Sequence, residues 1–512
     1  MPPVSRHSYR LFYHNALKNA IIFKNHLKKA VKYAKILSIQ LKTVNTAKER
    51  TILNNNKYAI ILAAGDGKRM KSDKPKVLAQ VLFYPMLGWV LDAVKAADID
   101  NTAVIVGSHK EQVTAYLDSI GGYPSFEQKE RLGTGHAVMQ AMPFINEAAA
   151  NNADILVACG DAPFIDAGTI AGSYEYHKAE SNDVTVVSAI IENPTGYGRI
   201  IKENGAFSAI VEQKDCTEEQ AQIREINSGI YWFRADKLSA LLDTLGNDNA
   251  AGEYYLTDTV AAAEKKGVYT ATSSDVVLGA NSRSQLAALN DTARRRKLAE
   301  LLDSGVDIPL SDGIIIGKDV KIGADTVILP NTIIKGNTVI GKNCEIGPNS
   351  YIENCIAEDN VTLNNVQAHD SKIDSGAKAG PFVHLRPGTH LHSGVKIGDF
   401  VEVKNSEVGI NTCIAHLTYI GDSDVGKGVN FGCGCVTANY DGIKKYRTTI
   451  GDNAFIGCNT NMIAPVTIGD NATTAAGSTI TKDVPADSLA VERGQTRIIE
   501  NWEKNKKRIK KA

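Results

Sequence analysis

The stretch IIIGKDVKIGADTVILPNTIIKGNTVIGKNCEIGPNSYI, residues 314–352, decides the fold of the last third of this chain. Isoleucine recurs in it at every sixth position, at Ile316, Ile322, Ile328, Ile334, Ile340, Ile346 and Ile352. An amphipathic helix repeats about every 3.6 residues and an alternating strand every second residue, so neither gives this spacing. A parallel β-helix places one apolar residue on each face in every six, and the sequence therefore predicts a solenoid.

A second run continues the same rhythm near the end of the chain. Its members are Ile450, Ile456, Met462, Ile468, Thr474 and Ile480. Between the two runs the rhythm breaks around residues 433–449, and we expect a loop that leaves the coil there.

Length and charge limit the remaining possibilities. A chain of 512 residues exceeds the roughly 250–300 residues at which single cores stop growing, so we expect two or more domains. The 57 Lys and Arg residues balance 57 Asp and Glu residues, which leaves no overall field to attract nucleic acid or a membrane surface. Residues 1–50 nevertheless hold eleven basic residues and one acidic residue, Glu49, so the rest of the chain carries a net charge of −10.

Residues 1–52 form a basic leader that stands apart from the rest of the chain. Three interpretations of it remain open: a basic amphipathic helix on an anionic surface, a solvated disordered tail, or sequence upstream of the true start. We favour the last two, because recognisable domain sequence begins only at Tyr58. The basic tail Lys504–Lys511 is expected to be a solvated end.

The cysteines and the hydropathy pattern indicate the compartment. Eight cysteines are scattered without a disulfide framework and without a Cys/His cluster at metal spacing. No apolar stretch approaches the roughly 20 residues of a membrane span, and the leader lacks the apolar stretch and cleavage site of a secretory signal. We therefore expect a cytoplasmic protein with no integral membrane association and no nucleic-acid partner.

Between Tyr58 and about Gly279, short apolar runs alternate with helical stretches. The predicted strands are residues 58–64, 102–106, 154–158, 183–191 and 228–233. The predicted helices are residues 86–97 and 111–120. This alternation predicts an α/β domain with a mostly parallel sheet, in which ligands bind beyond the carboxyl ends of the strands.

The first of these strands runs into LAAGDGKRM, residues 62–70, with Lys76 close behind. Its two glycines let backbone N–H groups approach a phosphate chain, and Arg69 and Lys76 can neutralise the phosphate charge. No Gly-Lys-Ser/Thr follows, so this is not a Walker loop, and it is not the dinucleotide GxGxxG either. Taken alone, the motif could equally be a plain structural turn.

The LxxGxGxRM pattern followed by Pro-Lys resembles the sugar-nucleotide pyrophosphorylases. Further motifs stand in the order typical of the bacterial GlmU family: QKERLGTG (128–135), CGDAP (159–163), PTGYGRI (194–200), VEQKD (211–215), EINSGI (225–230) and GANSR (279–283). Members of that family combine N-acetylglucosamine-1-phosphate uridylyltransferase and glucosamine-1-phosphate N-acetyltransferase activities. The resemblance spans roughly residues 53–500 and covers both halves of the chain.

The resemblance implies a site that transfers a uridylyl group from UTP to N-acetylglucosamine-1-phosphate, giving UDP-N-acetylglucosamine and pyrophosphate. Arg69 and Lys76 would be its catalytic cations. The residues carried over to UTP and its uracil ring are Leu62, Ala63, Gly65, Lys76, Gln128, Gly133 and Thr134. The residues carried over to the sugar nucleotide are Gly198, Glu212, Asn227 and Asn281.

A divalent metal, Mg²⁺, would be held by Asp161 and Asn281, because Mg²⁺ prefers oxygen ligands and can be shared with phosphates. Asp161 has a structural alternative as a turn aspartate ahead of Pro163. The surrounding motifs favour the metal role.

A helix is predicted at residues 283–304, with an Asp-Ser-Gly stop at its end. We expect a uridylyltransferase domain at residues 53–282, a linker helix at 283–305 and a β-helix acetyltransferase domain at 306–512. The resemblance implies that this β-helix is left-handed, assembles as a homotrimer and binds substrates in grooves between subunits. Periodicity predicts the coil but not its hand.

The acetyltransferase site is indicated by residues that interrupt the repeat. Acetyl transfer needs an unprotonated amine, and histidine is the side chain suited to removing that proton near neutral pH. His416 is therefore the predicted base. The alternative is that His416 is an ordinary surface histidine of the coil with no catalytic role. The residues carried over to glucosamine-1-phosphate are Arg386, Lys404, Tyr419 and Asn430.

Acetyl-CoA, the co-substrate, is expected along the extended loop and the later coils. The residues carried over to it are Cys433, Asn439, Tyr440, Cys458, Ala476 and Arg493. Cys433 stands where alanine is common in the family and Cys458 where serine is common, and a thiol is the weaker hydrogen-bond donor. Phe83 and Tyr84 replace the more usual Gly-Lys pair.

Three classes of function compete. The chain could be a bifunctional enzyme, a single-activity sugar-1-phosphate nucleotidyltransferase whose β-helix is only an oligomerisation scaffold, or a regulatory subunit with two decayed sites. A scaffold would lack the set around His416, and a decayed subunit would have lost Lys76, Asp161 or Asn281. All are present, so the bifunctional enzyme is preferred.

Overall fold

The computed structural model describes residues 56–65 and 67–503. It divides into two compact units, one made of residues 56–79 with 86–282 and the other of residues 80–85 with 283–503. The leader, residues 1–52, lies outside the described residues. The tail Lys504–Lys511 lies outside them as well. Within the described part of the chain, no helix is long and apolar enough to cross a membrane.

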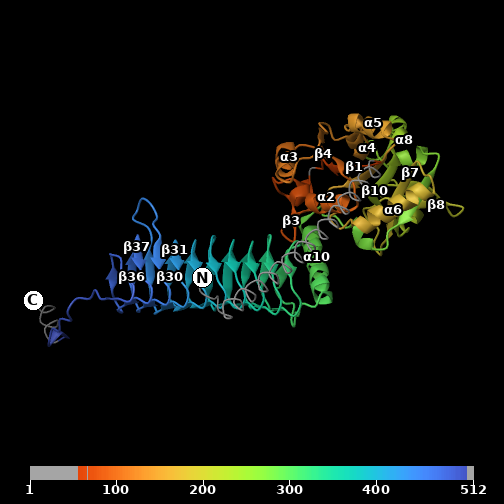
Figure 1. The fold of residues 1–512 in the computed structure, drawn as a ribbon. Coiled ribbons are helices and arrows are strands. Elements are labelled where there is room, and N and C mark those ends of the chain that lie inside the picture. The colour runs from red at the N-terminus through yellow and green to blue at the C-terminus, as the bar shows by residue number, and fades with distance from the viewer. Residues whose placement is uncertain (1–55, 66, 504–512) are drawn as a thin grey trace, which may run out of the picture. The chain divides into compact units, whose positions relative to one another are not determined.

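The first unit is an α/β fold around a mostly parallel sheet (Figure 1). Along the sheet the strands follow the order β11-β7-β10-β6-β1-β4-β5. Their bounds are β1 (Lys57–Ala63), β4 (Asn101–Val106), β5 (Ser125–Glu127), β6 (Asp154–Cys159), β7 (Val184–Ile190), β10 (Glu225–Arg234) and β11 (Lys266–Thr270), with β8 (Arg199–Glu203) and β9 (Ala206–Val211) attached beside β10. β1 pairs in parallel with β4 and β6, whereas β10 runs antiparallel to β6 and β7. The predicted α/β class and mostly parallel sheet are confirmed.

Helices pack against both faces of this sheet. Their bounds are α2 (Met86–Ala96), α3 (Lys110–Ser119), α4 (Thr134–Met139), α5 (Met142–Ala150), α6 (Ala167–Ala179), α7 (Glu218–Ala221), α8 (Ala235–Asp243) and α9 (Asp258–Ala262). Successive side chains of a strand point to opposite faces, so Ile60 packs into a core with Ile145 of α5, and Ile61 packs into a second core with Leu87 of α2. Burial on both faces explains why β1 is almost continuously apolar.

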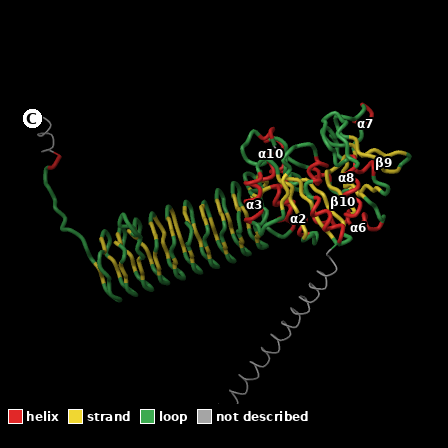
Figure 2. Tube along the Cα trace, turned by 90° about the horizontal axis from the view of Figure 1, so that it is seen from above, coloured by secondary structure: helices red, strands yellow, loops and turns green. Residues whose placement is uncertain are grey.

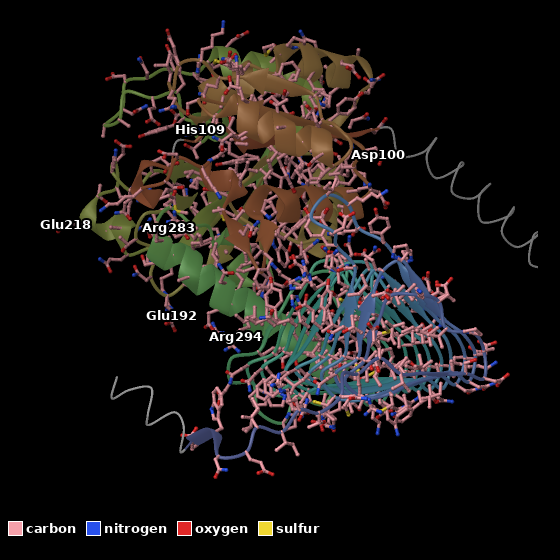
Figure 3. All side chains as sticks on the ribbon, turned by 90° about the vertical axis from the view of Figure 1, so that its left-hand side faces the viewer. Asp100, His109, Glu192, Glu218, Arg283 and Arg294 are labelled. Atoms are coloured by element: carbon pink, nitrogen blue, oxygen red, sulfur yellow. The ribbon has the colours of Figure 1, made fainter. Side chains whose placement is uncertain are left out.

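The second unit begins with helix α10 (Arg283–Asp303), which agrees with the predicted helix to within one residue. Arg283 and Arg294 are labelled on it in Figure 3, and Arg294 donates hydrogen bonds to the carbonyls of Ser311 at 3.1 Å and Ile314 at 3.4 Å. A short hairpin, β2 (Gln80–Val81) and β3 (Tyr84–Pro85), belongs to the same unit. The backbone N–H of Leu82 in its turn donates to Asn290 Oδ1 of α10 at 2.9 Å.

The rest of the second unit is a left-handed β-helix, drawn as a ladder of short yellow strands in Figure 2. Each coil contributes one strand to each of three parallel sheets, here named the first, second and third faces. The first face consists of β12 (Ile315–Ile316), β15 (Ile333–Lys335), β18 (Tyr351–Glu353), β21 (Val366–His369), β24 (Val383–Leu385), β27 (Glu402–Lys404), β30 (Tyr419–Gly421), β33 (Val436–Ala438), β36 (Asn461–Ile463) and β39 (Thr479–Ile480).

The other two faces continue each coil. The second face consists of β13 (Lys321–Ile322), β16 (Val339–Ile340), β19 (Ile356–Ala357), β22 (Lys372–Ile373), β25 (His390–Leu391), β28 (Glu407–Val408), β31 (Ser423–Val425), β34 (Thr448–Ile450) and β37 (Val466–Ile468). The third face consists of β14 (Val327–Ile328), β17 (Glu345–Ile346), β20 (Thr362–Leu363), β23 (Lys378–Ala379), β26 (Lys396–Asp399), β29 (Cys413–His416), β32 (Asn430–Phe431), β35 (Phe455–Ile456), β38 (Thr473–Thr474) and β40 (Leu489–Ala490).

The six-residue rhythm maps directly onto these faces. Ile316, Ile322 and Ile328 lie on the first, second and third face of one coil, and Ile334 stacks on Ile316 in the next. Their side chains fill one continuous core. Burying a side chain of this size contributes roughly 1.5–3 kcal/mol, so the repeated isoleucine supports the coil along its length.

The sharp corners of the coil explain its many asparagines. Asn331, Asn349 and Asn365 occupy the corner between the third and first faces with φ values of 60°, 53° and 51°. Asparagine tolerates this left-handed backbone better than most residues. The expected loop lies between β33 and β34, inside the predicted break, and stands out of the coil in the blue part of Figure 1.

Candidate active sites

A cleft of about 260 Å³ opens at the carboxyl ends of β1 and β6, where ligands of such sheets bind. Its lining residues are Leu62, Ala64, Gly65, Lys76, Val77, Gln128, Arg131, Gly133, Thr134, Ala137, Cys159, Asp161 and Glu253. Seven of the residues predicted for UTP, uracil and metal are in this set, namely Leu62, Gly65, Lys76, Gln128, Gly133, Thr134 and Asp161.

Three predicted residues converge on one point of this cleft. Lys76 Nζ forms an ion pair with the Asp161 carboxylate and donates a hydrogen bond to Asn281 Oδ1 at 2.8 Å. The side chains of Lys76 and Asp161 are only 12% and 20% exposed, so their charges act with little screening from water. The carboxylate and amide oxygens that meet at this amine are the donors that a hard divalent cation prefers. The residues present therefore fit Mg²⁺.

The predicted uracil-reading residues form a second group. Gln128 is buried, and its side-chain amide donates to the Gly133 carbonyl at 3.0 Å. Gly133 has φ +108°, and a Cβ there would lie 2.5 Å from the Tyr254 carbonyl oxygen, so no other residue fits. Thr134 Oγ1 accepts a hydrogen bond from the Leu256 backbone at 3.0 Å. These contacts hold the loop before α4 against the segment around Tyr254.

The predicted sugar-binding residues also lie together. The backbone N–H of Asn227 donates to the Gly198 carbonyl at 2.9 Å, and a Cβ on Gly198 would lie 3.4 Å from Glu212 Oε1. Burial raises the pKa of Glu212. A hydrogen bond from Thr257 opposes this shift, but the pKa remains above its ordinary value. A half-buried carboxyl beside a glycine leaves room for a polar ligand such as a sugar hydroxyl.

Two predicted residues differ from the rest in placement. Ala63 turns its side chain into the core below the sheet, and its neighbour Ala64 lines the cleft instead. Arg69 is exposed on the short 3₁₀ helix Lys68–Met70 and is not among the cleft-lining residues. Their predicted roles in binding and catalysis stay predictions.

Sequence reasoning missed several lining residues. Arg131 lies inside the quoted QKERLGTG motif and could have been found there, whereas Glu253 lies outside every motif. Cys159 also lines the cleft. Burial, followed by the nearby charge of Asp161, raises the pKa of Cys159 to about 12, so this thiol is no nucleophile at neutral pH.

On the β-helix, the residues predicted to bind the sugar phosphate lie along the corner between the first and second faces. Arg386 pairs with Glu402 at 2.8 Å, and Lys404 lies 3.6 Å from Asp422. Tyr419 is in register with Glu402 on the next coil. A side chain at Gly421 would collide with the Tyr419 hydroxyl, so this small residue makes room for the tyrosine.

Lys445, on the extended loop, belongs to the same group and was missed. A hydrogen-bonding contact with Lys404, followed by the repulsion between their charges, lowers the pKa of Lys445. Two ammonium groups this close attract an anion such as a phosphate. Lys445 gave no signal in the sequence, because it lies in the segment where the repeat breaks.

Asn439 joins this group as well. Its side-chain amide donates to the Asp422 carboxylate, to which Asn405 Nδ2 also donates at 2.6 Å. Burial alone would raise the pKa of Asp422, but these hydrogen bonds and the charge of Lys404 bring that pKa below its ordinary value. Within one chain, Asn439 therefore lies with the Lys404 group, and the neighbouring Tyr440 is 59% exposed on the loop.

The remaining predicted residues follow the opposite corner, between the third and first faces. His416 ends β29, and its successors at this corner on later coils are Cys433, Cys458 and Ala476. Asn430 is exposed on β32 of the third face. Arg493 lies beside the same corner. A Cβ on Gly477, the neighbour of Ala476, would lie 3.9 Å from Arg493 Cδ.

Beside His416 this corner carries an apolar ridge, defined as Phe382, Phe400 and Leu417. The three side chains are 57–59% exposed, and the two phenyl rings stack with centroids 5.2 Å apart. All three residues have positive φ where other coils use Asn or Gly. Bulky residues are genuine outliers in this backbone region, so the ridge is maintained at a conformational cost.

Two family models match the chain. A MobA-like NTP transferase domain matches residues 59–226, and a bacterial transferase hexapeptide model of six repeats matches residues 319–354 and 447–482. These ranges fall in the α/β unit and in the β-helix.

Curated proteins match over most of the chain. A protein of Acetivibrio thermocellus named bifunctional protein GlmU is 45% identical over 449 residues, covering 87% of this chain and 96% of its own length. A protein of the same name from Clostridium perfringens is 46% identical over 461 residues, covering 88% and 99%. Among solved structures, a UDP-glucose pyrophosphorylase complexed with UDP-glucose is 18% identical with a TM-score of 0.39, covering 47% of this chain and 99% of its own.

Proposed function

This chain belongs to the bifunctional GlmU family, and on that premise we propose that it makes UDP-N-acetylglucosamine by two successive reactions. It first transfers an acetyl group from acetyl-CoA to the amine of glucosamine-1-phosphate. It then transfers a uridylyl group from UTP to the resulting N-acetylglucosamine-1-phosphate and releases pyrophosphate. The observation that carries the proposal is that both residue sets are complete on one chain.

The α/β unit carries out the uridylyl transfer in its cleft. A sugar-phosphate oxygen attacks the α-phosphorus of UTP in line with the departing pyrophosphate, so catalysis depends on positioning and charge neutralisation. Lys76 neutralises phosphate charge, Gln128 and Gly133 orient the uracil, and Arg69 acts on the outer phosphates. Asp161 and Asn281 would hold Mg²⁺, which would supply further neutralisation of the phosphate charge.

The sugar lies against Gly198, Glu212 and Asn227, which group together outside the residues that line the cleft. The raised pKa of Glu212 supports a role in hydrogen bonding to a sugar hydroxyl, because its buried carboxyl has few competing partners.

The β-helix carries out the acetyl transfer. His416 takes a proton from the amine of glucosamine-1-phosphate, the amine nitrogen attacks the thioester carbonyl, the C–S bond breaks and the coenzyme A thiolate leaves. Arg386, Lys404 and Lys445 bind the sugar phosphate, and Tyr419 and Asn430 orient the sugar. No covalent enzyme intermediate is needed, so Cys433 and Cys458 contact the cofactor without acting as nucleophiles.

A homotrimer completes this second site. On one chain, the cations around Lys404 and the base His416 follow opposite corners of the first face, and the apolar ridge of Phe382, Phe400 and Leu417 stands exposed beside the base. A neighbouring copy that covers the ridge would bring its own cations to this base. Exposed phenyl rings held in an unfavourable backbone conformation support such an interface.

We assign the reactions to the cytoplasm. All eight cysteines are free, and buried thiols such as Cys355 and Cys435 are maintained without disulfides, which fits a reducing compartment.

Two separate assays test the proposal. Purified protein should release pyrophosphate from UTP and N-acetylglucosamine-1-phosphate with Mg²⁺ present, and should release coenzyme A from acetyl-CoA and glucosamine-1-phosphate without UTP. Pyrophosphate release without any release of coenzyme A would favour the alternative, a single-activity nucleotidyltransferase whose β-helix serves as an oligomerisation scaffold.

A further inference from the structure

The second face of the β-helix carries a cluster of two histidines and two carboxylates that neither proposed reaction uses. His390 and His392 are separated by one residue, and their rings lie with centroids 4.0 Å apart. Asp374 comes from the preceding coil and Glu407 from the following one. One ligand atom each from Asp374, His390 and His392 lies within 4.8 Å of the others.

The two carboxylates divide the four ring nitrogens between them. Asp374 contacts His390 Nε2 at 3.0 Å and His392 Nδ1 at 3.2 Å. Glu407 contacts the other nitrogens, His392 Nε2 at 3.1 Å and His390 Nδ1 at 3.7 Å. Each imidazole therefore presents one nitrogen toward Asp374 and is oriented by Glu407 through the other.

This arrangement has the two shells of a protein metal site. Metal-bound histidines characteristically donate their second N–H to a carboxylate, which fixes the tautomer and the ring orientation. Glu407 occupies that outer position for His392 at hydrogen-bonding distance and lies within ion-pair distance of His390. Two imidazole nitrogens and one carboxylate leave a fourth position open to water, as in three-ligand zinc sites.

The burial of the cluster agrees with this division. The side chains of Asp374, His390 and His392 are 13%, 19% and 30% exposed, whereas Glu407 is 59% exposed. The inner ligands are therefore held by their surroundings, yet the site remains open to an ion arriving from solvent.

We propose that Asp374, His390 and His392 bind a divalent transition-metal ion, with Glu407 as the outer carboxylate. Imidazole nitrogen favours ions such as Zn²⁺ over Mg²⁺, which prefers oxygen ligands. This site is distinct from the oxygen-lined pair Asp161 and Asn281. By joining two adjacent coils, with Glu407 of the next coil as the outer carboxylate, the ion would cross-link the β-helix rather than take part in either transfer.

Lys372 is the natural competitor for this site. Its amine lies 3.0 Å from Asp374 Oδ1 and is 47% exposed, so it can swing into solvent when an ion binds. Because its positive charge opposes a cation, Lys372→Met should tighten binding by about tenfold. A cluster that served only as a network of surface ion pairs would not gain affinity for a cation in this way.

Zn²⁺ titrated into the full-length protein tests the proposal. The titration is followed by calorimetry with excess Mg²⁺ present to occupy oxygen-lined sites. We expect about one Zn²⁺ per chain that is lost in His390→Gln and in His392→Gln, and affinity about 10–100-fold weaker in Glu407→Gln. Co²⁺ should give a visible absorption band that the same two histidine variants abolish.

His369→Gln is the matched control, because His369 also contacts a carboxylate, Glu353 at 3.5 Å, and another ring, His384. This control should bind Zn²⁺ as the unaltered protein does. The proposal is overturned if the two histidine variants retain the same Zn²⁺ stoichiometry and affinity, which would assign the ion to other groups such as the thiols. It is also overturned if Lys372→Met fails to tighten binding.

Discussion

Lys76 Nζ donates a hydrogen bond to Asn281 Oδ1 at 2.8 Å, across 205 positions of sequence. The same amine forms an ion pair with Asp161 at the end of β6. The loop after β1, the end of β6 and the last segment of the α/β unit therefore meet at one point. A change at any of these three residues should affect uridylyl transfer and leave the β-helix untouched.

The two activities should separate by mutation. Asp161→Asn removes the charge that holds Lys76 and the metal, so we expect uridylyl transfer to fall at least about a hundredfold. Acetyl transfer should remain unchanged, as measured by release of coenzyme A. Asp166→Asn is the control: Asp166 caps α6 by accepting from the Thr169 backbone at 2.8 Å, and because asparagine caps a helix about as well as aspartate, both stability and both activities should be retained.

His416→Gln should give the reverse pattern. Loss of the general base should lower acetyl transfer by about 10²–10⁴-fold, while pyrophosphate release continues at the normal rate. His369→Gln, on the first face of the same β-helix, controls for the loss of a partly exposed imidazole. Equal loss of both activities in either Asp161→Asn or His416→Gln would contradict two independent sites.

Lys445 should contribute to binding rather than to chemistry. A hydrogen-bonding contact with Lys404, followed by the repulsion between the two charges, lowers the pKa of Lys445, and an arriving phosphate relieves that repulsion. Lys445→Met should therefore raise the KM for glucosamine-1-phosphate with little change in kcat, because a phosphate contact is made equally in the ground state and the transition state. Lys444→Met, one residue away on the loop, is the control. A fall in kcat at constant KM would refute the binding role.

The apolar ridge can be removed without harming the coil. Asparagine is the usual residue at this corner, so the triple variant Phe382→Asn, Phe400→Asn and Leu417→Asn suits the local backbone better than the present residues. If the ridge is the trimer interface, light scattering should detect monomers, and acetyl transfer should be lost while uridylyl transfer persists. A variant that stays trimeric and keeps acetyl transfer would show that the interface lies elsewhere.

Thiol modification should block acetyl transfer alone. Cys458 is exposed and Cys433 is partly exposed, whereas burial raises the pKa of Cys435 to about 11 and makes that thiol slow to react. Iodoacetamide should therefore inactivate acetyl transfer, acetyl-CoA should protect against it, and the Cys433→Ala, Cys458→Ser double variant should resist. Inactivation of the double variant at the original rate, without protection, would remove the support for this cofactor path.

The sequence allowed the coil to be predicted because each isoleucine of the repeat has a single place, inside one face. It could not reveal the ridge, because Phe382, Phe400 and Leu417 come together only by occupying the same corner of successive coils. The coils differ in length, so this alignment is not visible as a fixed spacing in the sequence. Lys445 was missed for a related reason, since it lies where the rhythm stops. The sequence pointed to Ala63 as a cleft residue, whereas Ala64 lines the cleft. The two differ by one position at a strand end, where neighbouring side chains face opposite ways.

The most direct test of the central claim follows both reactions in one mixture. Glucosamine-1-phosphate, acetyl-CoA, UTP and Mg²⁺ are incubated with the protein, and the sugar products are followed over time by mass spectrometry. The account predicts that N-acetylglucosamine-1-phosphate appears first, that UDP-N-acetylglucosamine follows, and that omission of acetyl-CoA prevents both. Formation of a UDP-sugar without acetyl-CoA, or better use of glucose-1-phosphate than of N-acetylglucosamine-1-phosphate, would contradict it.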